Sequence, residues 1–346
     1  MYTSIKALFS CGRFKKPSHQ TRLRPNQTLI GTTNSPEHNP ITIYNSHSFD
    51  LYTRFSMAEL TAATNNFSPD LIIGSGRFRY IYKGQLSNGV VVAVKKLKPC
   101  EFQEFREFRA EMETQGKLCH RNILPLFGYC ESGDDRLLVF KFMEKGNLYQ
   151  WLHDRSSAQY ISHTLFPLSW ETRIKIIRGV ANELSYLHGL EKSIVHRNIS
   201  ASNILLDHEF EAQISQFGLA RRIQPSYSQS TDVAGTMGYL PPEYRNSSSG
   251  KVTVKADVYG FGVLMLEIAT GWWPSLFREV DIVDWAINMV AQNSQMQMVD
   301  PKISRKGLIE ASVVEYFRIA CMCITESPRE RPVMTEIVHL LNQILL

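Results

Sequence analysis

A change in hydrophobic periodicity near residue 145 constrains the fold of this chain most strongly. Residues 71–98 are rich in β-branched side chains and are interrupted by Ser87-Asn88-Gly89, a pattern typical of strands joined by a hairpin turn. From Gly146 onward the apolar residues recur every three or four positions, as in helices. The sequence therefore predicts a β-rich part, which includes a strand pair over residues 120–129 and 136–143, followed by a helical part. The helical period is carried by Leu148, Trp151, Leu152, Trp170, Ile174, Ile177, Val180, Ala181, Leu184 and Leu187.

Length and charge agree with a two-part domain that follows a basic tail. The 346 residues suit a two-lobed domain of roughly 270 residues plus a tail. The net charge of +5 lies in residues 1–55, which hold seven basic and two acidic side chains, because the rest carries 31 of each sign. No stretch approaches the roughly 20 apolar residues of a spanning helix, so we do not expect a transmembrane protein.

The six cysteines show no zinc-binding spacing. Cys321 and Cys323 are too close in sequence to form a disulfide easily. We therefore expect buried free thiols in a reducing cytosol. The other four are Cys11, Cys100, Cys119 and Cys130.

Residues 1–54 are predicted to be a basic, mostly disordered tail, because they are rich in Pro, Ser, Thr and Asn. Three interpretations stay open: a solvated tail, a peripheral membrane anchor with an acylated Cys11, or an organelle transit peptide. Tyr2 excludes N-myristoylation. Residues 55–66 are predicted to form a short helix, because Ser56 and Glu59 have the spacing of a capping box.

Two neighbouring motifs indicate a phosphate-binding site. Gly74 and Gly76 are the first two glycines of a G-x-G-x-x-G pattern, in which bare backbone can approach an anion. Arg79 stands at the place of the third glycine, where it either weakens the loop as a phosphate lid or binds phosphate itself. Lys95 ends Val92-Ala93-Val94-Lys95, and Glu111 follows sixteen residues later among Phe105, Phe108, Met112 and Leu118, which have a helical pattern.

A polar loop and a second short motif follow in the helical half. The loop runs from His196-Arg197-Asn198 to Asn203 and matches H-R-D-L-x-x-x-N, except that Asn198 replaces the Asp. An amide cannot accept a proton at neutral pH, so Asn198 cannot act as a general base. The second motif, Gln216-Phe217-Gly218, matches D-F-G with Gln216 at the metal-binding Asp.

Together these motifs resemble plant receptor-like kinases of the interleukin-receptor-associated-kinase and Pelle type, over about residues 67–341. The resemblance implies an α+β, two-lobed protein-kinase fold. Its smaller lobe, with a mostly antiparallel sheet and one main helix, and the hinge would occupy residues 67–143. Its larger helical lobe would occupy residues 144–343.

The resemblance also implies a role for individual residues. In an ATP site, Lys95 would pair with Glu111, Phe140 would be the gatekeeper, and the backbone of Lys141 and Met143 would meet the adenine. The other nucleotide-binding positions are Gly74, Gly76, Ile81, Ala93 and Leu205. The structural positions are His196, Arg197, Phe217, Glu243, Asp257 and Arg331, with Glu243 expected to pair with Arg331 and Asp257 to anchor the loop backbone. Candidate phosphorylation sites in the activation segment are Ser226, Tyr227, Ser228, Ser230, Thr231 and Thr236, and Arg197 with Arg221 or Arg222 would bind the added phosphate.

The departures from the family pattern predict a pseudokinase. Asn198 removes the base, and Gln216 with Asn203 makes a poor Mg²⁺ site. Ser200 replaces a Lys that contacts the γ-phosphate in the family. We therefore expect near-complete loss of phosphoryl transfer and weak, metal-independent ATP binding.

The expected function is that of an adaptor, decoy or allosteric partner of active receptor-like kinases or immune receptors. We expect the protein to act in the cytoplasm or at the inner face of the plasma membrane. One alternative is a slow Ser/Thr protein kinase. Another, a nucleic-acid- or lipid-binding module, rests only on the basic tail, and no nucleic-acid partner is expected.

Overall fold

The computed structural model describes residues 53–76, 79–98, 103–153, 167–223, 230–245, 249–274 and 281–345, which belong to one compact unit. Several residues singled out above lie outside these ranges. They are residues 1–52 of the tail, which include Cys11, and then Cys100, Ser226, Tyr227 and Ser228.

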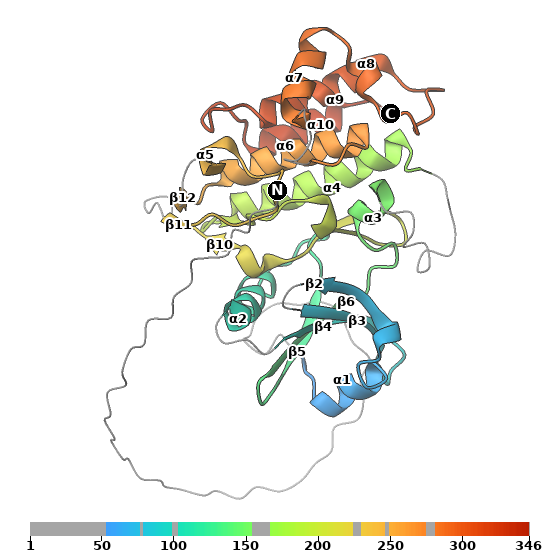
Figure 1. The fold of residues 1–346 in the computed structure, drawn as a ribbon, viewed down its shortest axis with the longest axis vertical. Helices are drawn as coiled ribbons and strands as arrows, with labels where there is room; N and C mark the ends of the chain where they lie inside the picture. The colour runs from blue at the N-terminus through green and yellow to red at the C-terminus, as the bar shows by residue number, and fades with distance from the viewer. Residues whose placement is uncertain are drawn as a thin grey trace, which may run out of the picture. The chain divides into compact units, whose positions relative to one another are not determined.

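The first lobe is built on a six-stranded sheet in the order β1-β5-β6-β4-β3-β2 (Figure 1). β1 pairs with β5 in parallel, and every other neighbouring pair is antiparallel. The predicted mostly antiparallel sheet is therefore confirmed. The strands are β1 (Thr53–Arg54), β2 (Ile72–Gly76), β3 (Arg79–Gln85), β4 (Val91–Leu97), β5 (Leu126–Ser132) and β6 (Asp135–Lys141).

Local sequence signals account for two features of this lobe. The β3–β4 hairpin turns at Ser87-Asn88-Gly89, and Gly89 has a φ of 84°, which glycine adopts without strain. The helix α1 (Met57–Ala63) begins with a capping box, in which Glu59 N donates to Ser56 Oγ and Ser56 N donates to Glu59 Oε2.

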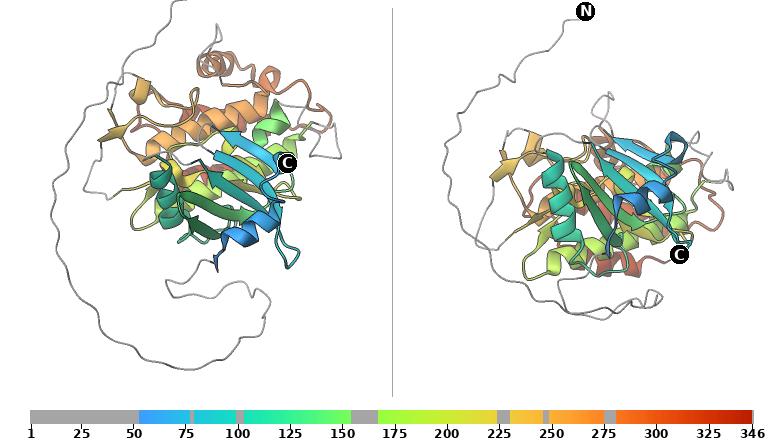
Figure 2. Two further views of the ribbon diagram at one scale, coloured as in Figure 1. Left: turned by 60° about the horizontal axis from the view of Figure 1, so that its bottom comes forward. Right: turned by 90° about the horizontal axis from the view of Figure 1, so that it is seen from below.

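The two faces of the sheet pack against different helices (Figure 2). On one face Val92, Val94 and Val139 pack with Leu60 of α1. On the other face the helix α2 (Gln103–Gln115) contributes Phe108 to a cluster with Leu97, Leu124, Leu138, Phe140 and Met143. Because side chains alternate along a strand, Ala93 and Lys95 lie on the α2 face of β4.

The start of β5 differs from the prediction. A strand was expected from His120, but β5 begins at Leu126. Ile123 N donates to His120 O at 3.0 Å, which closes a turn, and Pro125 has no N–H to give to a strand ladder. The preceding residues therefore form a turn rather than a strand.

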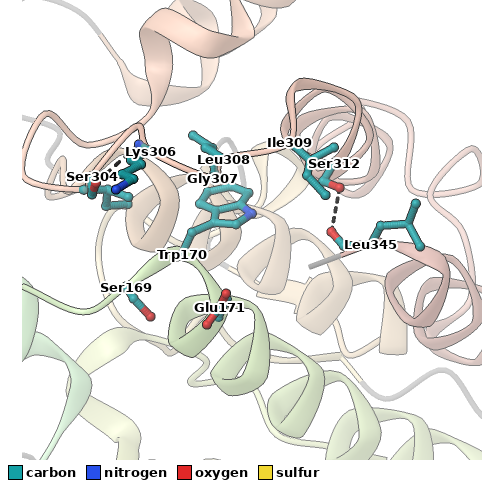
Figure 3. Close-up of a pocket in the computed structure, with 11 residues that line it drawn as sticks. Ser169, Trp170, Glu171, Ser304, Lys306, Gly307, Leu308, Ile309, Ser312 and Leu345 are labelled. Atoms are coloured by element: carbon teal, nitrogen blue, oxygen red, sulfur yellow. Dashed lines mark hydrogen bonds between the residues drawn. The ribbon is translucent and has the colours of Figure 1, made fainter.

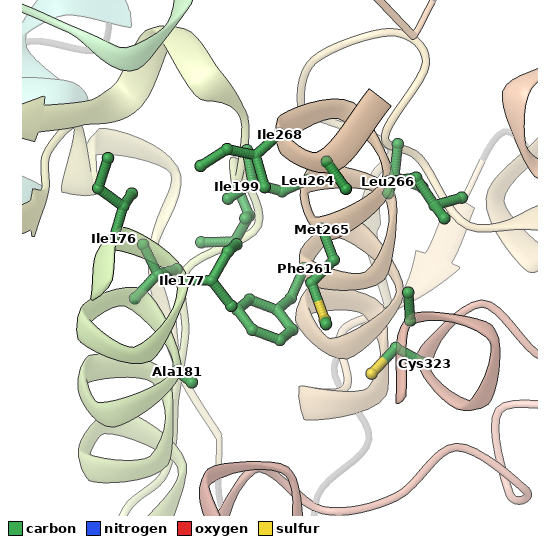
Figure 4. Packing of buried hydrophobic residues seen from close by; sticks show 14 of the residues in the cluster. Ile176, Ile177, Ala181, Ile199, Phe261, Leu264, Met265, Leu266, Ile268 and Cys323 are labelled. Atoms are coloured by element: carbon green, nitrogen blue, oxygen red, sulfur yellow. The ribbon is translucent and has the colours of Figure 1, made fainter. Parts of the chain in front are cut away.

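The second lobe is mainly helical and contains the main core. The buried helix α6 (Val254–Thr270) packs against α4 (Trp170–Gly189) and α9 (Glu310–Cys323), with Phe261, Met265 and Cys323 among the contacts (Figure 4). The other elements are α3 (Leu148–Leu152), β7 (Ile194–Val195), η3 (Ala201–Asn203), β8 (Ile204–Leu206), β9 (Ala212–Ile214), η4 (Phe217–Leu219), β10 (Arg221–Arg222), β11 (Ser230–Asp232), α5 (Pro242–Arg245), β12 (Ser249–Lys251), α7 (Ile282–Ala291), α8 (Gln295–Met298) and α10 (Met334–Gln343).

The expectation of buried thiols is only partly correct. Cys130 and Cys323 are buried free thiols, whereas Cys119 is exposed and Cys321 is partly exposed. Cys119 lies between α2 and β5, outside both elements. Within the described ranges, no helix is both long and apolar enough to cross a membrane.

Candidate nucleotide-binding site

A pocket of about 610 Å³ lies on the α2 side of the sheet and is closed below by the helical lobe. β2, β3 and β4 form its upper wall, and η3, β8 and the segment before η4 form its lower wall. It brings together most of the predicted nucleotide-binding residues. Gly76 is not among its lining residues, whereas Glu111, Asn203 and Gln216, which were predicted for catalytic or metal-binding roles, line it as well. The predicted nucleotide-binding residues that line it are Gly74, Ile81, Ala93, Lys95, Phe140, Lys141, Met143 and Leu205.

One end of the pocket is apolar and lies beside the hinge. Ala93 is opposite Phe140 in the β4–β6 ladder, and Leu205 of β8 belongs to the same apolar cluster. Lys141 N donates to Pro125 O at 3.0 Å, so this N–H is already used within the fold. The end of the pocket near Ala93 suits a flat apolar ring.

The other end contains a buried cation with two acceptors. Lys95 Nζ lies 2.6 Å from Glu111 Oε1 and 3.1 Å from Gln216 Oε1. The Lys95 and Glu111 side chains are 2% and 1% exposed, so each charge requires the other. The expected contact between Lys95 and Glu111 is therefore present, and Gln216 adds a second hydrogen-bond acceptor for Lys95.

The loop that follows β7 is anchored from below by one carboxylate. Asp257 accepts from His196 N and Arg197 N, both at 2.7 Å. These bonds hold Arg197 in the left-handed region, with a φ of 69°. The expected anchoring of this loop by Asp257 is thus observed.

The His196 ring is held as a neutral base. Nε2 lies 3.0 Å from Ser215 O, and Nδ1 accepts from Asn198 N at 3.3 Å, so the proton belongs on Nε2. Burial lowers the pKa of His196, which agrees with an uncharged imidazole. The ring also packs edge-on against Phe217, with centroids 4.9 Å apart.

The side chain of Asn198 is engaged with the activation segment. Thr236 Oγ1 donates to Asn198 Oδ1 at 2.7 Å, and Asn203 Nδ2 donates to Asn198 O at 2.8 Å. An amide oxygen with a donor already on it is a hydrogen-bond acceptor but no proton acceptor. Sequence reasoning missed the Thr236 contact, because 38 residues separate the pair and no motif relates them.

The residues of this pocket do not fit a magnesium ion. Mg²⁺ prefers carboxylate and phosphate oxygens in octahedral geometry. Among the described residues that line the pocket, the carboxylates are Glu111, which is paired with Lys95, and Glu144. Gln216 Oε1 faces an ammonium group, and a second cation there would be repelled. In the described part of the chain, no group of three or more His, Cys, Asp or Glu side chains is placed to hold a metal ion.

The remaining predicted positions are separate from the pocket. Arg331 Nη1 and Nη2 donate to the two oxygens of Glu243 at 2.8 and 2.7 Å, which is the expected pair. Arg197 Nη1 lies 3.4 Å from Leu219 O. Ser230 and Thr231 belong to β11, which pairs with β12.

A second, smaller pocket of about 150 Å³ lies in the helical lobe (Figure 3). The indole of Trp170 at the start of α4 forms its centre, and Ser312 Oγ donates to Leu345 O at its edge. Its walls come from residues 169–171, 303, 304, 306–309, 312 and 345, which are far apart in the sequence and form no motif.

The two lobes, the pocket between them and the buried Lys95–Glu111 pair define a protein-kinase domain. Residues 69–341 match the model of the protein tyrosine and serine/threonine kinase family. The chain belongs to this family, and it is a signalling protein of kinase fold related to plant receptor kinases.

Relatives of this chain are receptor kinases of plants. Phytosulfokine receptor 2 of Arabidopsis thaliana is 42% identical over 295 residues, covering 84% of this chain and 28% of the relative. The leucine-rich repeat receptor protein kinase MSP1 of Oryza sativa subsp. japonica is 43% identical, covering 82% and 22%. A probable receptor-like protein kinase of Arabidopsis thaliana, At5g18500, is 40% identical, covering 83% and 59%. This chain therefore spans from about a fifth to three fifths of these relatives.

Proposed function

We propose that this protein is a pseudokinase that binds and regulates active receptor-like kinases or immune receptors. The observation that carries the proposal is the replacement of two carboxylates by amides whose oxygens already accept hydrogen bonds within the fold. Asn198 accepts from Thr236, and Gln216 accepts from Lys95. Loss of a general base costs about 10²- to 10⁴-fold in rate. Without a metal ligand the phosphate charge is also not neutralised.

The proposed ligand of the pocket is ATP, bound weakly and without metal. The apolar end with Ala93 and Leu205 suits an adenine ring, and Lys95 supplies positive charge at the other end. ATP bound there would stabilise the closed arrangement of the lobes rather than react. Binding of the partner kinase or receptor would then depend on the conformation of the two lobes and not on phosphoryl transfer.

A slow Ser/Thr kinase is the second candidate. The intact ion pair of Lys95 and Glu111 favours it, because active kinases require this pair. Transfer of ³²P from ATP to the protein itself and to a generic peptide separates the two. We expect no transfer by the wild type above that of Lys95→Met. Transfer that disappears in Lys95→Met would establish the slow kinase instead.

The partner is tested with an active receptor-like kinase domain. After incubation with that kinase and ATP, phosphosites are mapped on this chain, and the rate of the active kinase is measured with and without it. We expect phosphate in residues 226–236 and a changed rate. Phosphate confined to residues 1–54, with an unchanged rate, would contradict the proposal.

The basic tail is proposed to add peripheral contact with the inner face of the plasma membrane. Seven of the basic residues lie in residues 1–55, and basic segments are attracted to anionic lipid. Sedimentation with vesicles containing phosphatidylserine measures this contact. We expect salt-sensitive binding that is lost on deletion of residues 1–30, and equal binding of the truncated chain would contradict it.

A further inference from the structure

Arg79 lies on the wall of the nucleotide pocket, on the same face of the sheet as Lys95. Side chains two residues apart on a strand share a face, so Arg79, Ile81 and Lys83 point the same way. All three line the pocket. Ile81 is directly opposite Lys95 in the β3–β4 ladder, which makes Arg79 the diagonal neighbour of Lys95. Diagonal neighbours have Cα atoms about 7–8 Å apart, within reach of long side chains.

The position of Arg79 corresponds to the far end of the pocket from the hinge. Lys83 is opposite Ala93, and Ala93 is opposite Phe140, so Lys83 marks the apolar end. Arg79 is opposite Leu97, four residues farther along β4. A ligand with its ring near Ala93 and an extended polar chain would pass Lys95 and then reach Arg79.

The Arg79 side chain lies against Gly76, its partner in the β2–β3 ladder. A Cβ built at Gly76 would lie 3.4 Å from Arg79 Cγ and 3.5 Å from its Cζ and Nε. The guanidinium therefore lies along bare backbone, where an ordinary side chain at residue 76 would contact it. Gly76 therefore leaves room for the side chain of Arg79.

The charges in the pocket favour an anion without a metal. Lys95 is compensated by Glu111, whereas Arg79 forms no ion pair with the described residues. The charged lining residues are Arg79, Lys83, Lys95 and Lys141 against Glu111 and Glu144, a formal excess of two positive charges. A guanidinium offers a planar fork of N–H donors that matches two phosphate oxygens.

We propose that Arg79 takes over the role of the missing metal by binding the outer phosphates of a metal-free nucleoside polyphosphate. This inference deepens the proposed ATP binding and depends on it. Mg²⁺ on the nucleotide weakens binding, because it neutralises the phosphates that Arg79 and Lys95 attract and finds no carboxylate at Gln216.

Calorimetric titration of the whole chain tests the inference, with ATP, ADP and AMP, in EDTA and in excess Mg²⁺. In EDTA we expect affinity to fall from ATP to ADP to AMP. Arg79→Gln should weaken ATP about tenfold and leave AMP within about twofold, because one charge-assisted contact is lost. Lys98→Gln, a control on the face of the sheet away from the pocket, where Lys98 lies over the ring of Tyr80, should change ATP binding less than about threefold.

Three results would overturn the inference: equal losses of ATP and AMP affinity in Arg79→Gln, a loss of ATP affinity in Lys98→Gln as large as that in Arg79→Gln, or tighter ATP binding by the wild type in Mg²⁺ than in EDTA. Failure of the wild type to bind any nucleotide would overturn it too. That failure would not affect the pseudokinase proposal, which is tested by phosphoryl transfer and by phosphorylation by a partner kinase. The thermal midpoint without nucleotide checks folding. Arg79→Lys, which keeps the charge without the fork, should bind ATP with intermediate affinity.

Discussion

Gln216 Oε1 accepts a hydrogen bond from Lys95 Nζ at 3.1 Å, at the position where an active kinase presents a metal-binding carboxylate. The same ammonium group lies 2.6 Å from Glu111. A neutral amide thus gives Lys95 a second hydrogen-bond acceptor without adding negative charge. The buried pair is retained while the adjacent metal site is lost.

Gln216→Asp should restore metal binding but not catalysis. Asp tolerates the left-handed backbone found here, with a φ of 70°, and supplies the missing anionic oxygen. We expect ATP binding to become tighter in Mg²⁺ than in EDTA, as measured by calorimetry. Phosphoryl transfer should rise only when Asn198→Asp is added, by about 10²-fold or more over the single variant. Equal transfer by the single and double variants would show that Asn198 does not limit the rate.

Arg331→Met should destabilise the helical lobe strongly. Arg331 is 1% exposed and donates to both oxygens of Glu243 and to backbone oxygens of Thr325 and Glu326. Glu243 is 28% exposed, so loss of its buried partner is expected to cost about 3 kcal/mol, the lower end of the range for a fully buried pair. Guanidinium denaturation measures this loss. Arg318→Met, which breaks an exposed pair with Glu315, is the control and should cost under about 1 kcal/mol. Similar losses for both would contradict the assignment.

Glu183→Gln should change how stability depends on pH. Glu183 in α4 is fully buried, and burial raises its pKa well above the usual 4.5, although one oxygen accepts from Ile214 N at 2.9 Å. A carboxyl group whose pKa is raised on folding contributes stability below pH 4.5 that is lost as pH rises through its folded pKa. The variant should therefore gain stability relative to the wild type between pH 5 and 8. Denaturation midpoints across this range test it, and parallel curves would contradict it.

Thr236→Val should loosen the contact between the activation segment and the loop that holds Asn198. The hydroxyl of Thr236 donates to Asn198 Oδ1 at 2.7 Å and lies 3.4 Å from Ser200 Oγ. Loss of this donor costs about 1 kcal/mol of unfolding free energy. Asn198→Asp keeps an acceptor at this place and should leave stability within about 0.5 kcal/mol. A larger loss for Asn198→Asp than for Thr236→Val would show that the amide nitrogen holds the loop.

Part of the fold and part of the site could be predicted from sequence, because their signals are local or belong to a known motif. Ser56 and Glu59 form their capping box within three residues. Lys95 and Glu111 are sixteen residues apart, yet the family pattern relates them. The start of β5 was predicted wrongly, because apolar residues before Pro125 have a strand-like pattern but form a turn.

The sequence by itself determined the kinds of groups in this protein: amides at residues 198 and 216, an arginine at residue 79, and strand patterns that give way to helix patterns near residue 145. Only the tertiary structure decided what those groups contact. The Asn198–Thr236 bond, the Gln216–Lys95 bond and the placement of Arg79 over Gly76 depend on where distant segments pack. The physical reason is that a hydrogen bond is sensitive to tenths of an ångström, whereas a residue pattern specifies only which face of an element is buried.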